Sequence, residues 1–302
     1  MNQNIYDKLK QILSSAQVKA DEPMKNHITF RVGGPADVYV VPKTKEELLQ
    51  VITCCKAENV PYYIIGNGSN LLVGDKGYRG VVIQIFKEMN EITCEGNVIC
   101  AQAGALLSQV AAKALEQSLT GFEFAAGIPG TLGGACVMNA GAYGGEMKDV
   151  LKEVTVLTDE GEFLTIPKEE LELGYRTSVI AKKGYIVIEA VLELKSGNAD
   201  EIRAYMDELK EKRITKQPLE YPSAGSTFKR PEGYFAGKLI EDAGLRGYQE
   251  GGAQVSEKHC GFVINRDHAT ASDIAGLCGT VQKRVYEQFG VKLETEVKML
   301  GF

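Results

Sequence analysis

The chain has 302 residues, which suggests about two domains and a core that needs no disulfide or metal to stabilise it. With 44% hydrophobic and 25% charged residues its composition excludes disordered and collagen-like chains, and a net charge of −6 argues against nucleic acid as a partner. No stretch is long and apolar enough to span a membrane, and the first residues lack a signal peptide's apolar core. We therefore expect a cytoplasmic protein with no membrane partner.

The cysteines and histidines give no sign of a metal site. The seven cysteines are odd in number and contain no Cys-x-x-Cys pair, which favours reduced thiols over zinc ligands. The three histidines, His27, His259 and His268, do not stand at metal-ligand spacing with carboxylates. We expect no bound metal.

The N-terminal segment begins with a helix followed by a short strand. Apolar residues recur at helical spacing at Ile5, Leu9, Ile12 and Leu13. Residues 37–41 then form an apolar run that is closed by Pro42, and we predict a strand there.

The next segment predicts a helix and a strand in β–α–β order. Thr44 has the chemistry of an N-cap, and Glu47 three residues later would complete a capping box for a helix that runs through Asn59. A strand over 62–65 then leads directly into the glycine-rich segment 66–70.

Residues 81–194 favour β-structure around one helix and one glycine-rich segment. The glycine-rich segment, 121–145, carries eight glycines in 25 residues. The predicted elements are a strand over 81–86, a hairpin over 92–103, a helix over 106–117, a second hairpin over 154–166 and a strand over 185–194.

The Ser-Gly-Asn triplet at 196–198 predicts a boundary before the C-terminal region. A highly charged helix over 199–216 follows and would link to a final unit that begins near Pro218. In that unit we predict strands over 261–265 and 291–299, with a long helix between them that Thr270 or Ser272 opens.

The two glycine-rich segments predict a site for a phosphate-containing ligand. Residues 66–70, Gly-Asn-Gly-Ser-Asn, follow a strand, and their glycines let backbone N–H groups converge on an anion. Leu71 stands where the Rossmann fingerprint requires glycine, and no P-loop motif occurs. The second segment, 125–145, is richer in glycine, which implies close approach of its backbone to a ligand. Two such loops suit a ligand with a diphosphate.

Eight short motifs occur in order between about Asn26 and Phe302. They cover residues 29–36, 66–70, 127–134, 139–143, 175–178, 224–229, 236–240 and 293–297. In this order the chain resembles the UDP-N-acetylenolpyruvoylglucosamine reductase family, also called UDP-N-acetylmuramate dehydrogenases, the flavoenzymes of bacterial peptidoglycan precursor synthesis.

The resemblance implies an α+β fold, with a vanillyl-alcohol-oxidase-like (PCMH-type) FAD-binding domain of two lobes and a smaller α+β substrate-binding domain. We expect the first lobe at 1–85, the second lobe at 86–197 and the substrate-binding domain at 198–302. Only residues 177–184 separate Arg176 from the next predicted strand. The chain thus resembles the shorter subtype, which lacks the Tyr-bearing insertion that closes over the substrate, and we expect a monomer.

The resemblance also implies the reaction. NADPH would reduce FAD, and hydride transfer followed by protonation would convert UDP-N-acetylglucosamine enolpyruvate, a small-molecule substrate, into UDP-N-acetylmuramate. Because no histidine lies in the glycine-rich loops, we expect FAD to be held noncovalently. The residues expected to bind it are Gly66, Asn67, Gly68, Ser69, Asn70, Leu71, Gly127, Ile128, Pro129, Gly130, Thr131, Gly133 and Gly134.

Three residues match the family's catalytic positions. Arg176 would grip the substrate carboxylate, because a guanidinium binds a carboxylate through two hydrogen bonds. Glu296 would be the protonated partner of the developing enolate. In a regular strand over 291–299, Glu294 and Glu296 share one face, so the pattern does not separate them, and only the resemblance selects Glu296.

Ser226 is the matched proton donor. No Gly-x-Ser-x-Gly motif surrounds it, which argues against an acyl-transfer nucleophile. The side chains expected to bind the UDP diphosphate and sugar are Tyr175, Lys229, Arg230, Lys238 and Gln249.

Two other functions remain open from the residues alone. An FAD-linked oxidase or dehydrogenase acting on a small alcohol or sugar lactone would share the flavin loops, but it would have no need of Arg176, Ser226 and Glu296. A non-catalytic nucleotide-binding module would need only the loops.

Overall fold

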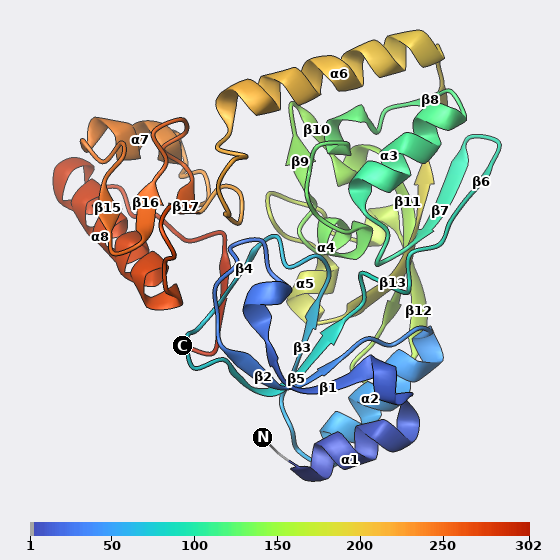
Figure 1. Cartoon of the computed structure of the whole chain (residues 1–302). Coiled ribbons are helices and arrows are strands. Elements are labelled where there is room, and N and C mark those ends of the chain that lie inside the picture. Colours follow the sequence, from blue (N-terminus) through green and yellow to red (C-terminus); the bar gives the residue numbers. More distant parts are fainter. Residues whose placement is uncertain (1–2) are drawn as a thin grey trace.

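The N-terminal segment folds into a four-stranded sheet with two helices packed together beside it (Figure 1). The computed structural model describes residues 3–302. The elements of this part are α1 (Gln3–Ile12), β1 (Val18–Pro23), β2 (Pro35–Val40), α2 (Lys45–Ala57), β3 (Tyr62–Ile65), β4 (Leu71–Val73) and β5 (Tyr78–Gln84). The sheet order is β1-β2-β5-β3, and β2 and β3 run parallel to β5. The predicted helices and the predicted strands at β2 and β3 are confirmed, and β1, which was not predicted, lies between α1 and β2 in the chain.

The start of α2 confirms one half of the predicted capping box and corrects the other. The Thr44 hydroxyl accepts a hydrogen bond from the Glu47 backbone N–H at 3.1 Å, as predicted. The Glu47 carboxylate, however, accepts hydrogen bonds from the Lys43 backbone N–H and the Gln17 side-chain amide, each at 2.7 Å. The predicted second half of the capping box, a hydrogen bond from the Thr44 backbone N–H to the Glu47 carboxylate, is therefore wrong. The carboxylate instead turns toward Gln17, which lies directly before β1.

The middle of the chain forms a five-stranded antiparallel sheet with short helices around it (Figure 1). The sheet order is β12-β11-β13-β7-β6, and both predicted hairpins are confirmed. The elements are β6 (Ile92–Glu95), β7 (Val98–Gln102), α3 (Leu107–Glu116), β8 (Leu119–Thr120), α4 (Leu132–Val137), β9 (Gly141–Ala142), β10 (Gly145–Glu146), β11 (Leu151–Leu157), β12 (Phe163–Pro167), α5 (Val179–Lys183), β13 (Ile186–Glu193) and β14 (Lys195–Ser196).

The C-terminal region begins with α6, which crosses one side of the molecule toward a small three-stranded sheet and two further helices (Figure 1). Helix α6 spans the predicted residues, and Thr270 rather than Ser272 caps α8. The elements are α6 (Ala199–Lys216), α7 (Ala236–Asp242), β15 (Gln249–Glu250), β16 (Ala253–Val255), β17 (Val263–Asn265), α8 (Ala271–Phe289) and β18 (Lys298–Leu300).

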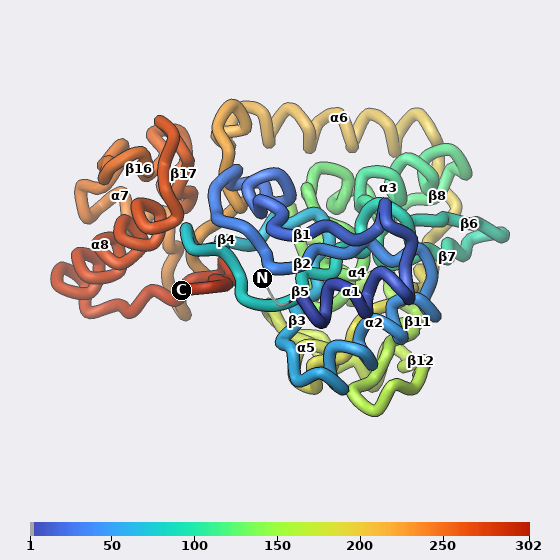
Figure 2. The backbone as a smooth tube through the Cα atoms, turned by 60° about the horizontal axis from the view of Figure 1, so that its bottom comes forward, coloured from blue at the N-terminus to red at the C-terminus, as the bar shows by residue number. Residues whose placement is uncertain are grey.

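The strand predicted over 291–299 is mostly wrong. Only β18 is a strand, and it pairs in parallel with β4, which is about 230 positions earlier in the chain (Figure 2). The preceding residues are held in an extended path by two backbone hydrogen bonds, from Lys229 N–H to the Glu294 carbonyl and from Glu296 N–H to the Thr227 carbonyl, each 2.8 Å long. This path is set by tertiary contacts and not by a regular sheet.

Two hydrophobic cores run through the molecule, and the first 85 residues contribute to both. One core joins side chains such as Leu48 and Ile83 to Leu132 and Leu192 of the middle segment. The other joins Phe30 and Leu72 to residues of α8. The predicted domain boundaries at 85/86 and 197/198 stay predictions.

Residues 3–302 contain neither a helix suited to span a membrane nor a cluster of side chains suited to hold a metal ion. None of the helices in this range is both long and apolar enough to cross a bilayer. The same residues contain no cluster of three or more His, Cys, Asp or Glu that could hold a metal ion.

Candidate active site

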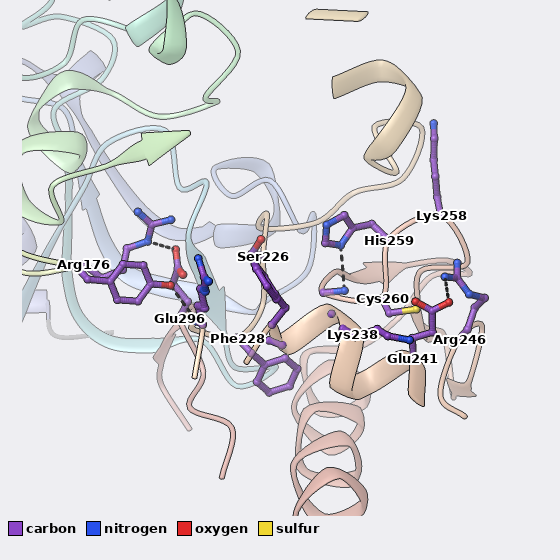
Figure 3. Close-up of a pocket in the computed structure, with 16 residues that line it drawn as sticks. Arg176, Ser226, Phe228, Lys238, Glu241, Arg246, Lys258, His259, Cys260 and Glu296 are labelled. Carbon is purple, nitrogen blue, oxygen red and sulfur yellow. Dashed lines mark hydrogen bonds and ion pairs between the residues drawn. The ribbon is translucent and has the colours of Figure 1, made fainter. Parts of the chain in front are cut away.

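One cavity of about 380 Å³ collects side chains from the middle segment and the C-terminal region (Figure 3). Arg176, Ser226 and Glu296 all line it, although they lie at least 50 residues apart in the chain. Tyr175, Arg230 and Lys238 line it as well. The structure thus brings the three matched catalytic positions and three of the five expected substrate residues to one place.

Arg176 and Glu296 form an ion pair at one end of the cavity. Arg176 Nε donates to Glu296 Oε1 at 2.8 Å, and both side chains are largely buried (Figure 3). Burial raises the pKa of the Glu296 carboxyl, and the neighbouring guanidinium offsets part of that rise. The terminal nitrogens of Arg176 have no hydrogen-bond partner among residues 3–302, so they remain available to a ligand carboxylate.

The Arg176 backbone has a positive φ of 55°, in the left-handed region that non-glycine residues seldom adopt. Its loop leads into α5, whose N-cap Ser178 accepts from the Ala181 backbone N–H and donates to the Val137 carbonyl. The tight turn places the guanidinium opposite Glu296 instead of along the loop surface.

Glu294 lies in very different surroundings from Glu296. Its side chain is 68% exposed and pairs with Lys229 at 3.0 Å, whereas the Glu296 side chain is 11% exposed. Lys229 holds the pKa of the Glu294 carboxyl below its usual range, opposite to the shift at Glu296. The two carboxylates that the sequence pattern could not separate are therefore distinguished by burial.

Ser226 is held in place by its neighbours and not by its own side chain. Gly225 has a φ of 75°, and the Thr227 backbone N–H donates to the Gly261 carbonyl at 2.8 Å. The Thr227 hydroxyl accepts from Val263 N–H at 2.9 Å. The Ser226 hydroxyl is left exposed in the cavity without a hydrogen-bond partner in the described chain.

The two glycine-rich loops meet each other. The Asn67 side-chain amide donates to the Pro129 carbonyl at 2.8 Å. A Cβ at Gly66 would lie 2.2 Å from the Thr131 hydroxyl oxygen, so glycine is required there by the approach of the other loop. The partly exposed members of the two segments thus form one surface, whereas the expected residues Gly68, Leu71, Thr131 and Gly133 are buried behind it.

Other features of this surface fit a bound cofactor. A Cβ at Gly130 or Gly134 would meet nothing closer than 3.7 Å, and neither residue has a positive φ, so contacts within the protein do not explain these glycines. The Thr29 hydroxyl is buried without a hydrogen-bond partner among the described residues. A bound ligand would explain both observations: it would fill the space beside the two glycines, and it would account for a polar atom that the protein leaves without a partner.

Arg213, which the sequence analysis did not select, lies over the same surface. It belongs to α6, and its guanidinium is 3.1 Å from the position that a Cβ would take at Gly127. Its Nε donates to the Gln217 amide at 2.9 Å, and no described carboxylate forms an ion pair with it. Burial lowers the pKa of this guanidinium. A half-buried cation without an acidic partner favours an anionic ligand.

The first glycine-rich loop also connects to Glu296. The Asn70 side-chain amide donates to the Glu296 carbonyl at 3.3 Å, and the Lys298 backbone N–H donates to the Asn70 carbonyl at 3.1 Å. Directly after these contacts, β4 and β18 pair. A ligand bound to this loop would therefore lie near the end of the cavity where Glu296 pairs with Arg176.

Two expected substrate residues do not line the cavity. Lys229 pairs with Glu294 outside it, and the Gln249 amide donates to the Gly251 carbonyl at 3.0 Å in the β15 turn. Tyr175 and Arg230, which do line the cavity, contact each other: the Tyr175 hydroxyl accepts from the Arg230 backbone N–H at 2.9 Å.

Several lining residues were missed by the sequence analysis: Phe235, Glu241, Arg246, Lys258, His259 and Cys260. They come from α7 and from the turns on either side of β15 and β16. No periodic pattern marks such residues, because turns bring them together. The only signal was the Ser-Glu-Lys-His-Cys-Gly run at 256–261, which concentrates polar residues before a strand.

The comparisons with known proteins match both parts of the chain. Residues 217–300 match the family model of the UDP-N-acetylenolpyruvoylglucosamine reductase C-terminal domain. Residues 36–167 match the model of an FAD binding domain.

Relatives of the same name cover the chain almost completely. The UDP-N-acetylenolpyruvoylglucosamine reductase of Clostridioides difficile (strain 630) is 57% identical over 99% of both chains. The protein of that name from Agathobacter rectalis is also 57% identical, over 100% of this chain and 99% of the relative.

Solved structures support the fold. The UDP-N-acetylenolpyruvylglucosamine reductase of Thermus caldophilus superposes with a TM-score of 0.79 at 37% identity, over 94% of this chain and 98% of that one. Phl p 4.0202, a glucose dehydrogenase, has a TM-score of 0.50 at 13% identity over 70% of this chain and 50% of that one, which shows a shared fold alone. The α+β fold with a PCMH-type FAD-binding domain is thereby confirmed. The chain belongs to the UDP-N-acetylenolpyruvoylglucosamine reductase family of FAD-dependent oxidoreductases.

Proposed function

We propose that this chain reduces UDP-N-acetylglucosamine enolpyruvate to UDP-N-acetylmuramate in peptidoglycan precursor synthesis, with noncovalent FAD and with NADPH as the reductant. The observation that carries the proposal is the convergence of Arg176, Ser226 and Glu296 in one cavity beside the paired glycine-rich loops. A flavoenzyme acting on a small alcohol would need the loops but not this set of side chains.

The two glycine-rich loops would hold FAD, with Gly130 and Gly134 leaving room for its close approach and Arg213 facing its negative charge. When bound, the flavin supplies the hydride that reduces the enolpyruvyl double bond. The protein's own part is to bind and orient the substrate and to provide the charges and the proton that this addition requires.

Arg176 would bind the carboxylate of the enolpyruvyl group. An enol ether is electron-rich, so it accepts a hydride only when the negative charge that develops toward the carboxylate is stabilised. The free terminal nitrogens of Arg176 can provide that stabilisation with two parallel hydrogen bonds. A preorganised donor of this kind accelerates such reactions by about 10²–10³.

Glu296 would change its protonation state with substrate binding. In the free protein the Arg176 guanidinium offsets part of the effect of burial on the Glu296 pKa. A substrate carboxylate on Arg176 would cancel that offset and add a like charge, and both effects raise the pKa further. Glu296 would then carry a proton and donate a hydrogen bond to the enolate-like species.

Ser226 would deliver the proton to the carbon next to the carboxylate. Its hydroxyl is a weak acid, so its fixed position matters more than its acidity. The hydrogen bonds of Thr227 to Gly261 and Val263 supply that position. A serine hydroxyl freed of internal partners can donate to the carbanionic centre as charge builds there.

The far end of the cavity would take the nucleotide. Lys238 lines this end with Arg246 and Lys258 (Figure 3), whereas Tyr175 and Arg230, which are hydrogen-bonded to each other, lie beside Arg176. These groups suit a diphosphate and sugar. Since all the residues come from one chain, we propose a monomer as the working unit, and we place the reaction in the cytoplasm.

The proposal is tested by steady-state turnover with product analysis. NADPH consumption should depend on the enolpyruvyl nucleotide, and the nucleotide product should gain two hydrogen atoms by mass spectrometry. NADH in place of NADPH measures the coenzyme preference. Turnover of small alcohols or sugar lactones with oxygen, without reduction of the enolpyruvyl nucleotide, would show that the protein is an FAD-linked oxidase instead.

A further inference from the structure

The cavity contains a histidine that the proposed mechanism does not use. His259 follows β16 and lies half-buried in the cavity wall. In Figure 3 its ring is drawn between Ser226 and the cationic side chains of Lys238, Arg246 and Lys258. It therefore lies between the reacting end of the cavity and the end that suits a nucleotide.

The hydrogen bonds of His259 define which ring nitrogen carries the proton. Nδ1 accepts a hydrogen bond from the Gly261 backbone N–H at 3.1 Å. A nitrogen that accepts is unprotonated, so the proton of the neutral ring sits on Nε2. Nε2 has no hydrogen-bond partner anywhere in residues 3–302. The ring thus offers one unused N–H donor in the cavity.

The ring is also fixed in orientation. Phe262 packs edge-on against it with the ring centroids 5.0 Å apart. A Cβ at Gly261 would lie 2.9 Å from His259 Cε1, and one at Gly237 would lie 3.5 Å from it. Glycine at 261 therefore makes room for the ring, and α7 covers its other side. A donor held this firmly loses little side-chain entropy on binding.

The groups around the ring keep it neutral. Burial lowers the pKa of His259, and the Arg246 guanidinium lowers it further. Lys238 and Lys258 add positive charge, while Glu241 pairs with Arg246 at 2.7 Å and Asp242 pairs with Lys238 at 2.6 Å. Lys258 donates to the Ile214 carbonyl at 2.6 Å and lies 3.7 Å from Glu220. Each of the three cations is thus paired with a carboxylate, so it is mainly burial, helped by the Arg246 guanidinium, that disfavours a positive charge on His259.

We propose that His259 binds the diphosphate of the nucleotide substrate through its Nε2–H, as a neutral donor beside the three cations. The identity of the ligand rests on the proposed function. The turn that carries His259 also holds Ser226, because the Gly261 carbonyl accepts from Thr227 N–H at 2.8 Å. One turn therefore sets the distance between the diphosphate and the proton donor.

Two substitutions of the holoenzyme separate this contact from a structural role. In His259→Gln the side-chain amide reaches the Nε2 position and keeps a donor there, whereas in His259→Asn it reaches only the Nδ1 position. We expect His259→Asn to raise KM for the enolpyruvyl nucleotide and Kd for UDP by about tenfold or more, with kcat nearly unchanged. His259→Gln should stay within about threefold of wild type on the same scale.

His268→Asn is the matched control. His268 is exposed, lies outside the cavity and has a φ of 50°, which asparagine tolerates, so its KM and Kd should not change. Binding of uridine provides a second control, because it lacks the diphosphate and should be equally weak in wild type and both His259 variants.

Three results would overturn the proposal. They are unchanged UDP binding in His259→Asn, an equal loss in His259→Gln, and a loss for uridine as large as for UDP. If His259→Asn does not fold, ¹⁵N-histidine labelling of the wild type decides: UDP, but not uridine, should shift the His259 Nε2 resonance, and no shift refutes the contact. If wild type reduces the enolpyruvyl nucleotide and one of these results is found, the His259 contact is refuted but the proposed function is not. If wild type does not reduce the nucleotide, the proposed function itself is refuted.

Discussion

The carboxyl groups of Glu294 and Glu296 differ in the energy of their charged forms. Glu294 is solvated and paired with Lys229, so ionisation is easy. Glu296 is enclosed by the cavity wall, and Arg176, with smaller contributions from Lys229 and Lys298, compensates only part of the cost of burying its charge. A proton that must be held near neutral pH and then shared with an enolate is better kept by the buried group.

Replacing each carboxylate by its amide tests this difference. We expect Glu296→Gln to lower kcat and kcat/KM together by about 10², because Gln keeps a hydrogen-bond donor but has no proton to share. Glu294→Gln is the matched control and should stay close to wild type, since it loses only an exposed ion pair. A defect in Glu294→Gln that matches or exceeds that of Glu296→Gln would show that Glu296 is not the catalytic carboxylate.

The pH profile follows from the direction of the Glu296 shift. A carboxyl whose pKa is raised stays protonated to higher pH than an ordinary glutamic acid, and the protonated fraction falls as the pH rises through that pKa. The rate at which substrate reoxidises the flavin should therefore fall with rising pH in wild type. Glu296→Gln should lose this limb. If the reoxidation rate of Glu296→Gln falls over the same pH range as that of wild type, the titrating group is not Glu296.

Ser226 acts in one half of the reaction only, according to the proposal. Ser226→Ala should leave flavin reduction by NADPH nearly intact and slow reoxidation by the enolpyruvyl nucleotide by at least about 10². Stopped-flow absorbance of each half-reaction measures the two rates separately. Ser223→Ala, in the same loop but outside the cavity, is the control. Equal losses in both halves for Ser226→Ala would indicate a structural role.

At the residue scale, the sequence was informative where a motif carries the chemistry. The motifs around Arg176, Ser226 and Glu296 were enough to name these residues, and the structure brings them together. The same reasoning failed for Arg246 and His259, because their neighbours in space come from turns. Gln249 was selected for its chemistry, yet its turn directs it to Gly251.

At the element scale, α6 does more than connect two parts of the chain. Its last turns place Arg213 against Gly127 of the second glycine-rich loop, and the next residue, Ile214, accepts a hydrogen bond from Lys258 of the cavity wall. One helix end thus contacts both the expected cofactor surface and the expected substrate cavity. The helix fixes their relative position.

Arg213→Gln tests whether α6 contributes to cofactor binding. If Arg213 binds the FAD diphosphate, as proposed, removing this cation should raise the Kd for FAD by about tenfold or more. The apoprotein should be as stable as wild type or more stable, because a half-buried guanidinium without an acidic partner is costly. Flavin fluorescence titration and thermal unfolding measure the two quantities.

Arg203→Gln is the matched control for this experiment. Arg203 lies on the exposed side of the same helix, so neither FAD affinity nor stability should change beyond experimental error. A loss of apoprotein stability in Arg213→Gln with unchanged FAD affinity would mean that Arg213 only packs α6 onto the loop.

The elements that were predicted correctly are those whose signals are local. The two hairpins and α6 carry their own turn or capping residues. The bounds of α6 agree with the structure and those of the first hairpin agree to within one residue, whereas β11 begins three residues before the predicted start of the second hairpin. β1 was not predicted because charged residues fill this edge strand, and its pairing with β2 uses the backbone. β18 forms only because β4 is available to it, so no pattern within 291–299 could have fixed its length.

At the scale of the whole molecule, residues 3–85 connect the parts of the enzyme. Their side chains belong to both hydrophobic cores, and the chain end returns to pair with β4. A ligand that bridges the two glycine-rich loops would tie together segments of both cores. FAD should therefore stabilise the protein as a unit, by an amount that grows with the logarithm of its concentration above Kd.

The mode of FAD attachment is a prediction at the same scale. No histidine or cysteine lies in residues 66–71 or 127–134, so these loops offer no side chain for a covalent flavin bond. The purified protein should be yellow, and unfolding followed by filtration should place all of the flavin in the filtrate. Flavin retained with the denatured chain would contradict noncovalent binding.

Anaerobic mixing of photoreduced protein with UDP-N-acetylglucosamine enolpyruvate tests whether the reduced flavin passes its electrons to the enolpyruvyl group. Oxygen and NADP⁺ are both absent, so the enolpyruvyl group is the only available electron acceptor. We expect the yellow colour of oxidised flavin to return and UDP-N-acetylmuramate to form in an amount equal to the flavin. Flavin that stays reduced until oxygen is admitted would contradict this expectation.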